Sequence, residues 1–306
     1  MIRLSVVIPA FNAGSLLAAA VRSVAAAERG DVEVLVVDDG STDGSAEAVA
    51  QDMAAPAAAR VMLLRQANRG PGAARNRGLE AARGDLVGFL DADDVWLPGR
   101  AAALLGTGTA EAAALARADL IYSDYVLRNL ATGAGTPHAC QPLAPPAARS
   151  LVLHNPICTS TVVARRAALV AAGGFREDLR FAEDWDLWLR VAERASLTHV
   201  AAAWAEHRER AGSLAGGNLA ALHRAGELVL AAALARAPEL YGPVARAARA
   251  NLELRSGVRA QRAGDLGAAR RHLARAVCGG RFRPALRLLA ASLFAGEGRE
   301  AGGAEA

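Results

Sequence analysis

Two apolar runs in the first hundred residues each end in a group of aspartates. Residues 34–37 lead to Asp38 and Asp39, and residues 86–90 lead to the aspartates of segment 91–94. Continuous apolar runs suit strands that are buried on both faces of a parallel sheet. The carboxyl ends of such strands lie at one edge of the sheet, where open α/β sheets bind ligands. Carboxylates gathered there repel one another unless a cation neutralises them, and Mg²⁺ or Mn²⁺ carrying a diphosphate suits these oxygen ligands.

Strands and helices alternate along this part of the chain. The pattern predicts strands at residues 4–9, 33–38, 61–64 and 85–90, and helices at about 15–27 and 72–82. Repeated βα units of this kind predict an α/β fold with a Rossmann-like, mostly parallel sheet flanked by helices.

Two absences narrow the chemistry. A dehydrogenase-type dinucleotide fold needs Gly-x-Gly-x-x-Gly after its first strand, whereas segment 9–14 reads Pro-Ala-Phe-Asn-Ala-Gly. All 35 basic residues are arginine. A chain without lysine cannot form a Schiff base, and the same absence argues against the lysine-dependent sugar-nucleotide pyrophosphorylases.

Five segments, in this order, resemble one family. They are residues 5–12 (Ser-Val-Val-Ile-Pro-Ala-Phe-Asn), 36–45 (Val-Val-Asp-Asp-Gly-Ser-Thr-Asp-Gly-Ser), 72–78 (Gly-Ala-Ala-Arg-Asn-Arg-Gly), 89–94 (Phe-Leu-Asp-Ala-Asp-Asp) and the pair Glu183-Asp184. Over roughly the first two-thirds of the chain, the set is similar to the inverting glycosyltransferases of family 2, which have the GT-A fold.

The resemblance implies a nucleotide site at the ends of the first two strands. Asp39 looks like the reader of the nucleobase, because a carboxylate accepts the imide N3–H of uracil or thymine. The other residues placed at the substrate there are Pro9, Ala10, Phe11, Asn12 and Asp38. The alternative is an ordinary turn and helix cap at Asp38 and Asp39.

The resemblance also implies a metal site in segment 91–94. Asp93 would bind Mg²⁺ or Mn²⁺ directly, Asp91 would face the ribose or a metal-bound water, and Asp94 would face the donor sugar. A solvated acidic loop is the alternative.

Asp184 resembles the family's general base, with Glu183 beside it to orient the acceptor or the base. An inverting transfer is one in-line displacement, so it needs one carboxylate to take the acceptor's proton. Trp185 and Trp188 offer faces on which sugars stack. A purely structural interpretation remains open, because acidic residues are favoured at a helix N-terminus and the tryptophans have the spacing of a buried helix face.

Other substrate contacts are expected from Arg75 and Asn76, although a surface arginine and a capped turn would explain them equally well. Relatives carry an aromatic-Arg-x-His pattern after the last strand of the domain. Here Arg208 matches it, but Arg210 stands where histidine is usual. We expect both arginines to contact the diphosphate.

The expected domains are a GT-A domain over residues 1–214, with a nucleotide-sugar half at about 1–98 and an acceptor half at about 99–214, and an all-helical region over 215–306. Residues 132–148 are expected to form a loop. The pattern in residues 264–276 is faintly tetratricopeptide-like. Residues 215–306 carry 14 Arg against 7 acidic residues. This excess favours peripheral contact with an anionic membrane or an arginine-rich solvated face, and nothing indicates nucleic acid binding.

The sequence therefore predicts a bacterial, hexosyltransferase-type enzyme of cell-envelope polysaccharide biosynthesis. It would move a sugar from a nucleotide-diphosphate sugar, UDP-linked by preference, to a glycan or lipid-linked acceptor. The alternatives are an inactive nucleotide-binding scaffold acting through the helical region and a sugar-nucleotide pyrophosphorylase. Three scattered cysteines and the absence of a signal peptide or an 18-residue apolar run favour a cytoplasmic protein, peripheral at most at the inner face of the membrane.

Overall fold

A computed structural model describes residues 1–26, 30–52, 60–209 and 218–294 of the chain. The chain divides into two compact units. The first contains residues 1–148 and 156–210, and the second contains residues 149–155 and 211–306. The border lies close to the predicted one at residue 214, but segment 149–155 belongs to the second unit.

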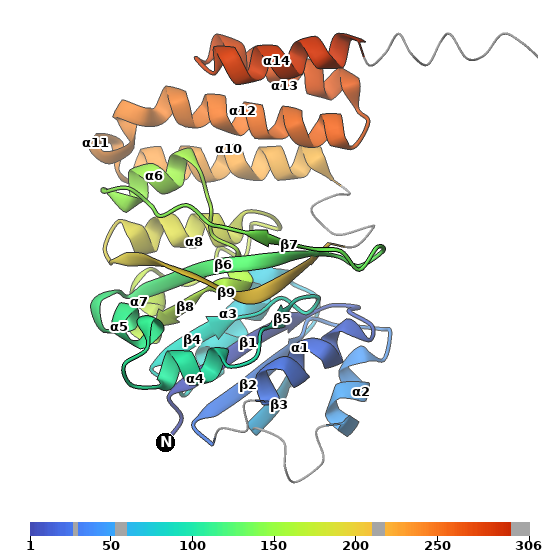
Figure 1. Ribbon diagram of the computed structural model, residues 1–306, viewed down its shortest axis with the longest axis vertical. Coiled ribbons are helices and arrows are strands. Elements are labelled where there is room, and N and C mark those ends of the chain that lie inside the picture. The colour runs from blue at the N-terminus through green and yellow to red at the C-terminus, as the bar shows by residue number, and fades with distance from the viewer. Residues whose placement is uncertain (27–29, 53–59, 210–217, 295–306) are drawn as a thin grey trace, which may run out of the picture. The chain divides into compact units, whose positions relative to one another are not determined.

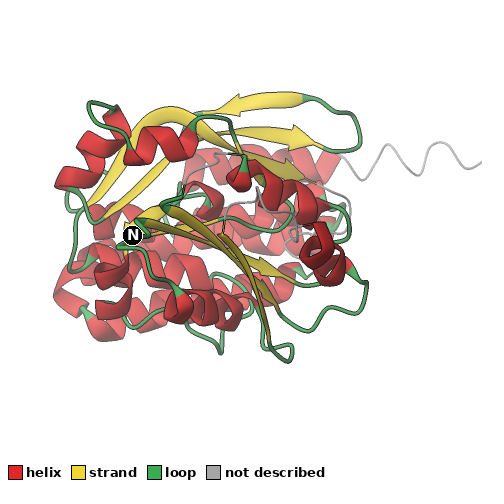
Figure 2. Cartoon of the chain, turned by 90° about the horizontal axis from the view of Figure 1, so that it is seen from below, coloured by secondary structure: helices red, strands yellow, loops and turns green. Residues whose placement is uncertain are grey.

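The first unit is built on a curved, mixed sheet, nine-stranded over the described residues, in the order β3-β2-β1-β4-β8-β6-β9-β5, with β7 beside β6 (Figures 1 and 2). The strands are β1 (Leu4–Ala10), β2 (Val32–Asp38), β3 (Arg60–Arg65), β4 (Leu86–Phe89), β5 (Val95–Trp96), β6 (Leu120–Asn129), β7 (Gly135–His138), β8 (Val163–Arg165) and β9 (Leu197–Glu209). The helices are α1 (Leu16–Ala25), α2 (Ser45–Asp52), α3 (Pro71–Ala81), α4 (Arg100–Leu105), α5 (Ala110–Arg117), α7 (Arg166–Ala171) and α8 (Glu183–Ala192), while α6 (Ala147–Leu153) runs into the second unit.

The nucleotide half matches the expected βα alternation. β1 pairs in parallel with β2 and β4, and β2 pairs in parallel with β3. The described strands begin or end within two residues of the predicted ones. Asp38 closes β2, and segment 91–94 follows β4. Both acidic groups therefore leave the sheet at its carboxyl edge, as the apolar runs predict.

Helices α1 and α3 cover opposite faces of this half, because successive side chains of a strand point to opposite sides. Leu4, Val6 and Ile8 of β1 share a buried cluster with Leu17 of α1. Val7 points the other way, towards Gly78 of α3. A Cβ atom at residue 78 would lie 2.3 Å from Val7 Cγ1, so only glycine allows α3 to lie this close to β1.

We expect Gly78→Ala to destabilise the protein by about 1 to 3 kcal/mol, the usual cost of overpacking a rigid core. The urea midpoint of the first unit measures the change. Gly30→Ala is the matched control, since Gly30 lies in the same unit without a positive φ, and a Cβ atom added there would have no contact within 4 Å. Equal midpoints for the two variants would contradict the close packing of α3 on β1.

The acceptor half is mainly antiparallel: β8 pairs with β4 and β6, β5 pairs with β9, and only β6 and β9 run in parallel. The expectation of a loop over residues 132–148 is wrong in part, because β7 forms a hairpin with β6. All four residues of β7 are exposed and one is proline. Because β7 buries no side chain, its sequence lacks the alternation of apolar and polar residues by which a strand is predicted.

The second unit is helical, as predicted. It contains α10 (Leu219–Arg236), α11 (Pro238–Tyr241), α12 (Ala245–Arg262), α13 (Leu266–Cys278) and α14 (Phe282–Phe294). Asp265 caps α13 as expected, its carboxylate accepting the Ala268 N–H at 2.8 Å. Leu273, Ala276 and Ala285 form a buried cluster between α13 and α14. None of the helices in the described ranges combines the length and the apolar character needed to cross a bilayer.

Candidate active site

The Asp39 carboxylate organises the loop that leads into α3. It is 3% exposed. Its Oδ1 accepts hydrogen bonds from Gln66 Nε2 at 2.8 Å and the Arg69 N–H at 2.9 Å, and its Oδ2 accepts the Gly70 N–H at 2.8 Å. A carboxylate has about four acceptor positions, so one remains for a further donor. Asp39 therefore holds the loop and has one acceptor position left.

The turns after β1 and β2 are tied together. Asn12, at a positive φ of 49°, accepts the Thr42 N–H at 2.8 Å through its side-chain oxygen. Its own N–H donates to Ser41 Oγ at 3.1 Å. Asp38 Oδ1 accepts the Ser41 N–H at 2.9 Å. Asn12 and Asp38 thus fix the shape of these turns.

Apolar residues stand beside these turns. At the end of β1, Pro9 is partly exposed and Ala10 is buried, while Phe11 is 49% exposed. Of these three residues, all predicted to lie at the substrate, Phe11 offers the most open surface.

Arg75 joins two of the predicted carboxylate groups. Its Nη1 donates to Glu183 Oε1 and its Nη2 donates to Asp91 Oδ1, both at 2.6 Å. Burial alone would lower the pKa of Arg75, but the carboxylates of Asp91 and Glu183 raise it above its ordinary value. Arg75 is therefore a permanent buried cation, not a surface arginine. It brings together segments separated by about a hundred residues.

Asp184 lies in the first turn of α8 with its carboxylate held on both sides. Oδ1 accepts the Trp185 N–H at 2.7 Å, and Oδ2 accepts the Thr159 hydroxyl at 3.0 Å. Desolvation raises the pKa of Asp184, which makes it a stronger proton acceptor. Ala182, two residues before Asp184, has a φ of 58°. A non-glycine residue in that region is strained, as residues at functional sites often are.

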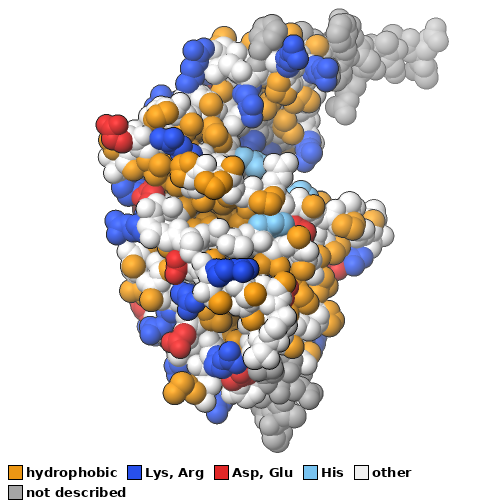
Figure 3. Space-filling model, turned by 60° about the vertical axis from the view of Figure 1, so that its left-hand side comes forward, with side chains coloured by type: hydrophobic (Ala, Val, Ile, Leu, Met, Phe, Trp, Pro, Cys, Tyr) orange, Lys and Arg blue, Asp and Glu red, His pale blue; other side chains and the backbone are white. Residues whose placement is uncertain are grey.

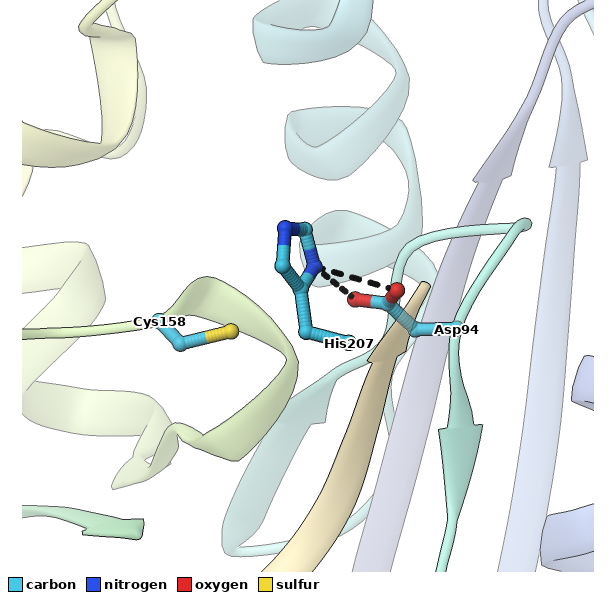
Figure 4. A group of neighbouring side chains, drawn as sticks. All are labelled: Asp94, Cys158 and His207. Atoms are coloured by element: carbon cyan, nitrogen blue, oxygen red, sulfur yellow. Dashed lines mark hydrogen bonds and ion pairs between the residues drawn. The ribbon is translucent and has the colours of Figure 1, made fainter. Parts of the chain in front are cut away.

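Asp94 is buried and holds the end of β9 (Figure 4). Both of its oxygens lie 3.1 Å from His207 Nδ1, and Oδ1 also accepts the Arg208 N–H at 2.8 Å. The Ser160 hydroxyl donates to Oδ2 at 2.5 Å. The hydrogen bond to Asp94 raises the pKa of His207 to about 9. In this structure Asp94 therefore faces Ser160 and His207, and sequence analysis missed both of these partners.

The donor set at this edge fits a divalent cation. Asp91 and Asp93 are partly exposed beside the buried Asp94, and Asp94, Cys158 and His207 offer ligand atoms within 4.8 Å of one another. Carboxylate oxygens are the ligands that suit Mg²⁺ or Mn²⁺. Burial raises the pKa of Cys158 well above its ordinary value, so its sulfur stays protonated and is a poor ligand. Oxygen ligands, with His207 beside them, thus fit the cation best.

The structure corrects the expectation that tryptophans of α8 stack on a sugar. Trp185 is 5% exposed and Trp188 is 0% exposed. Trp188 packs against Phe89 and Phe175, with ring centroids 6.0 and 5.9 Å away. Neither indole has a free face, because the apolar stripe of α8 packs into the core.

The remaining predicted contacts have protein partners. Asn76 donates to the Phe175 carbonyl at 2.9 Å and accepts the Phe175 N–H at 2.8 Å, so it fastens a loop. Arg208 Nε donates to Glu206 at 2.8 Å. Arg210 lies outside the described residues.

The chain is similar to known proteins in sequence and in fold. A family model described as "Glycosyl transferase family 2" matches residues 5–169. The succinoglycan biosynthesis protein ExoU of Rhizobium meliloti is 45% identical over 101 residues, which are 33% of this chain and 29% of that protein. The chain spans less than a third of the length of such curated relatives.

Solved structures share the fold. S. aureus TarS 1–349 in complex with UDP-GlcNAc has a TM-score of 0.62 at 18% identity, covering 90% of this chain and 82% of that one. The mannosyltransferase PcManGT of Pyrobaculum calidifontis, in complex with GDP-Man and Mn²⁺, has a TM-score of 0.58 at 21% identity, covering 99% and 88%.

Proposed function

The chain belongs to glycosyl transferase family 2 and has the GT-A fold, and on this premise we propose that it is an inverting glycosyltransferase. Its donor is a nucleoside-diphosphate sugar, preferably UDP-linked, and its acceptor is a glycan or a lipid-linked glycan. The observation that carries the proposal is the double contact of Arg75 with Asp91 and Glu183. Through these contacts the guanidinium of Arg75 brings Asp91, a proposed metal ligand, close to Glu183, which precedes the proposed base Asp184 on α8.

In the proposed reaction an acceptor hydroxyl attacks the anomeric carbon of the donor. The new glycosidic bond forms as the bond from that carbon to the diphosphate breaks, and the proton of the hydroxyl passes to Asp184. Thr159 and the Trp185 N–H orient the Asp184 carboxylate. Arg75 fixes Glu183 beside it, so that the base keeps its position during the transfer. A positioned base contributes on the order of 10² to 10⁴ in rate.

Asp91 and Asp93 would hold the divalent cation, with His207 close by. A bound Mg²⁺ or Mn²⁺ supplies Lewis-acid stabilisation of the charge that develops on the leaving diphosphate. Asp94 keeps the imidazole of His207 in place through two 3.1 Å contacts. We propose that Arg208 and the donor sugar meet at this same edge.

We propose that Asp39 reads the base of the donor through its remaining acceptor position. Uracil has an N3–H donor, whereas cytosine has a lone pair at N3. A carboxylate therefore favours uracil, and an amide can donate to cytosine instead.

Asp39→Asn is expected to weaken UDP binding by about 1 to 3 kcal/mol, the cost of losing a buried hydrogen-bond partner, and to lower the ratio of UDP to CDP affinity. Calorimetry with both nucleotides measures the ratio. Gln66→Ala is the matched control, because it removes one donor to Asp39 and leaves the carboxylate in place. Equal losses of UDP and CDP affinity in Asp39→Asn would limit Asp39 to its role in the loop.

The acceptor and the location complete the proposal. Polysaccharide biosynthesis is supported by the name of the succinoglycan relative. The proposed site of action is the cytoplasmic face of the bacterial membrane, and the arginine excess of residues 215–306 favours contact with anionic lipid. On the face drawn in Figure 3, the arginines are spread singly among apolar and uncharged side chains. Such a distribution favours loose, salt-sensitive binding over a fixed lipid site.

A further inference from the structure

Three helices of the second unit bring two histidines and a glutamate together. His223 lies on α10, Glu253 on α12 and His272 on α13. One ligand atom from each lies within 4.8 Å of the other two. The proposed transferase reaction uses none of these residues.

The spacing of the three side chains fits one small cation. His272 Nδ1 lies 2.6 Å from Glu253 Oε2, and His223 Nε2 lies 3.8 Å from Glu253 Oε1. Tetrahedral zinc with bonds of about 2.0 to 2.1 Å sets neighbouring ligand atoms roughly 3.3 Å apart. The observed distances lie on both sides of that value, so small side-chain rotations would complete the geometry.

The orientation of His223 is already fixed. Its Nδ1 lies 2.8 Å from Ser256 Oγ in a buried hydrogen bond, which leaves Nε2 directed towards Glu253. Metal-binding histidines commonly have such a partner on the nitrogen that does not bind the ion. The side chain of His223 is only 9% exposed, so solvent does not compete for this nitrogen.

The surroundings of His223 favour its neutral form, which is the form that can act as a ligand. Burial lowers the pKa of His223, with His272 acting in the same direction and Glu253 opposing both. The ring centroids of the two histidines are 4.5 Å apart, and two charged rings at that distance would repel each other. Neutral imidazole is the form that binds metal ions.

A cavity and a further carboxylate lie beside the cluster. The cavity, of about 190 Å³, is lined by His272 and Ser256 but not by His223 or Glu253, and Arg259 and Arg271 line it too. Glu227, one turn after His223 on α10, has its Oε1 3.5 Å from His223 Nε2 and a side chain that is 59% exposed.

We propose that the helical unit binds one Zn²⁺ ion through His223, Glu253 and His272, with the fourth position taken by Glu227 or water. The ion links α10, α12 and α13 and thereby stabilises the helical unit. Imidazole and carboxylate ligands in a three- or four-ligand site match zinc. Without an ion, the same residues would form only a hydrogen-bonded cluster.

The test is zinc binding by the full chain, purified without a histidine tag and treated with a chelator. Zinc affinity and stoichiometry are measured by calorimetry and elemental analysis, and stability by thermal melting with and without Zn²⁺. The variants are Ser256→Ala, which removes only the partner of His223, and Glu253→Gln, whose amide oxygen still accepts from His272. His138→Ala is the matched control, since it removes an exposed imidazole from β7.

We expect the helical unit of the wild-type chain to bind one equivalent of zinc and the melting temperature to rise by several degrees, because a ligand stabilises the state that binds it. Ser256→Ala should weaken this binding 10- to 100-fold, Glu253→Gln should abolish it, and His138→Ala should leave it unchanged. Zinc bound near Asp93 would appear equally in all four proteins. Identical zinc binding and melting in the wild type and Glu253→Gln would overturn the proposal, as would the absence of zinc binding by the wild type.

Discussion

Asp184→Asn is expected to lower the rate of sugar transfer by about 10² to 10⁴, the usual contribution of a positioned general base. The amide has nearly the same shape as the carboxylate, and its oxygen can still accept one of the hydrogen bonds from Thr159 and the Trp185 N–H. It cannot take a proton at neutral pH. Donor affinity should therefore stay within about threefold of the wild-type value, which corresponds to roughly 0.6 kcal/mol.

The measurement is product formation beside donor affinity or, before an acceptor is known, slow release of nucleoside diphosphate from the donor. Asp178→Asn makes the same chemical change at an exposed aspartate that pairs with Arg176, and it should retain full activity. Equal turnover in Asp184→Asn and the wild type would move the base to Glu183 or Asp186. Of these two, Asp186 is 1% exposed and bonded to Arg190 at 2.8 Å, which favours Glu183.

Asp93→Ala is expected to reduce transfer by on the order of 10²-fold or more. Lewis-acid stabilisation contributes several kcal/mol in general, and each 1.4 kcal/mol is a factor of about ten in rate. The same change should remove the effect of Mn²⁺ on nucleoside diphosphate affinity. Calorimetry of UDP with and without Mn²⁺, beside the turnover assay, measures both effects.

The matched control for this variant is Asp85→Ala, an exposed aspartate at the opposite end of β4. It should bind UDP and Mn²⁺ like the wild type. If Asp93→Ala kept both its turnover and its response to Mn²⁺, the metal would have to be held by other carboxylates, for instance by Asp91.

The nucleotide half of the fold was predictable because its signals are local. The strands β1, β2 and β4 are largely buried on both faces, so β2, for example, carries the continuous apolar run 34–37 and is buried at all seven positions. Parallel strands end at the same edge of the sheet, which is the edge that binds ligands. The ends of β2 and β4 therefore place Asp38 and segment 91–94 at that edge. The helical unit was predictable for the same reason, as with Asp265 at the start of α13.

The contacts that assemble the candidate site were not predictable, because they join residues far apart in the sequence. Arg75 reaches Glu183, 108 positions away, and His207 reaches Asp94, 113 positions away. Both contacts depend on how the strands β8, β6 and β9 extend the sheet beyond β4. The one local signal for His207 is its place next to Arg208, in a pattern that predicts contacts for Arg208 and Arg210.

Burial also decided between interpretations that the sequence left open. Trp185 and Trp188 have the spacing of a helix face, and that spacing alone cannot distinguish a core stripe from a sugar platform. The aromatic cluster of Phe89, Phe175 and Trp188 settles the role of Trp188 as packing. For Arg75, burial favours the functional interpretation. The sequence left open a surface arginine, but Arg75 is 5% exposed and lies between two carboxylates.

The central claim is that this chain transfers a sugar from a nucleotide donor, and consumption of that donor tests it most directly. The purified chain is incubated with UDP-, dTDP- and GDP-sugars, each with and without Mn²⁺, and release of the nucleoside diphosphate is followed beside the Asp184→Asn and Asp93→Ala variants. We expect metal-dependent release from a UDP-sugar by the wild type, and release at least about 100-fold slower by both variants. A wild-type chain that binds a nucleoside diphosphate but consumes none of these donors, with or without a glycan acceptor, would contradict the claim and favour a nucleotide-binding scaffold.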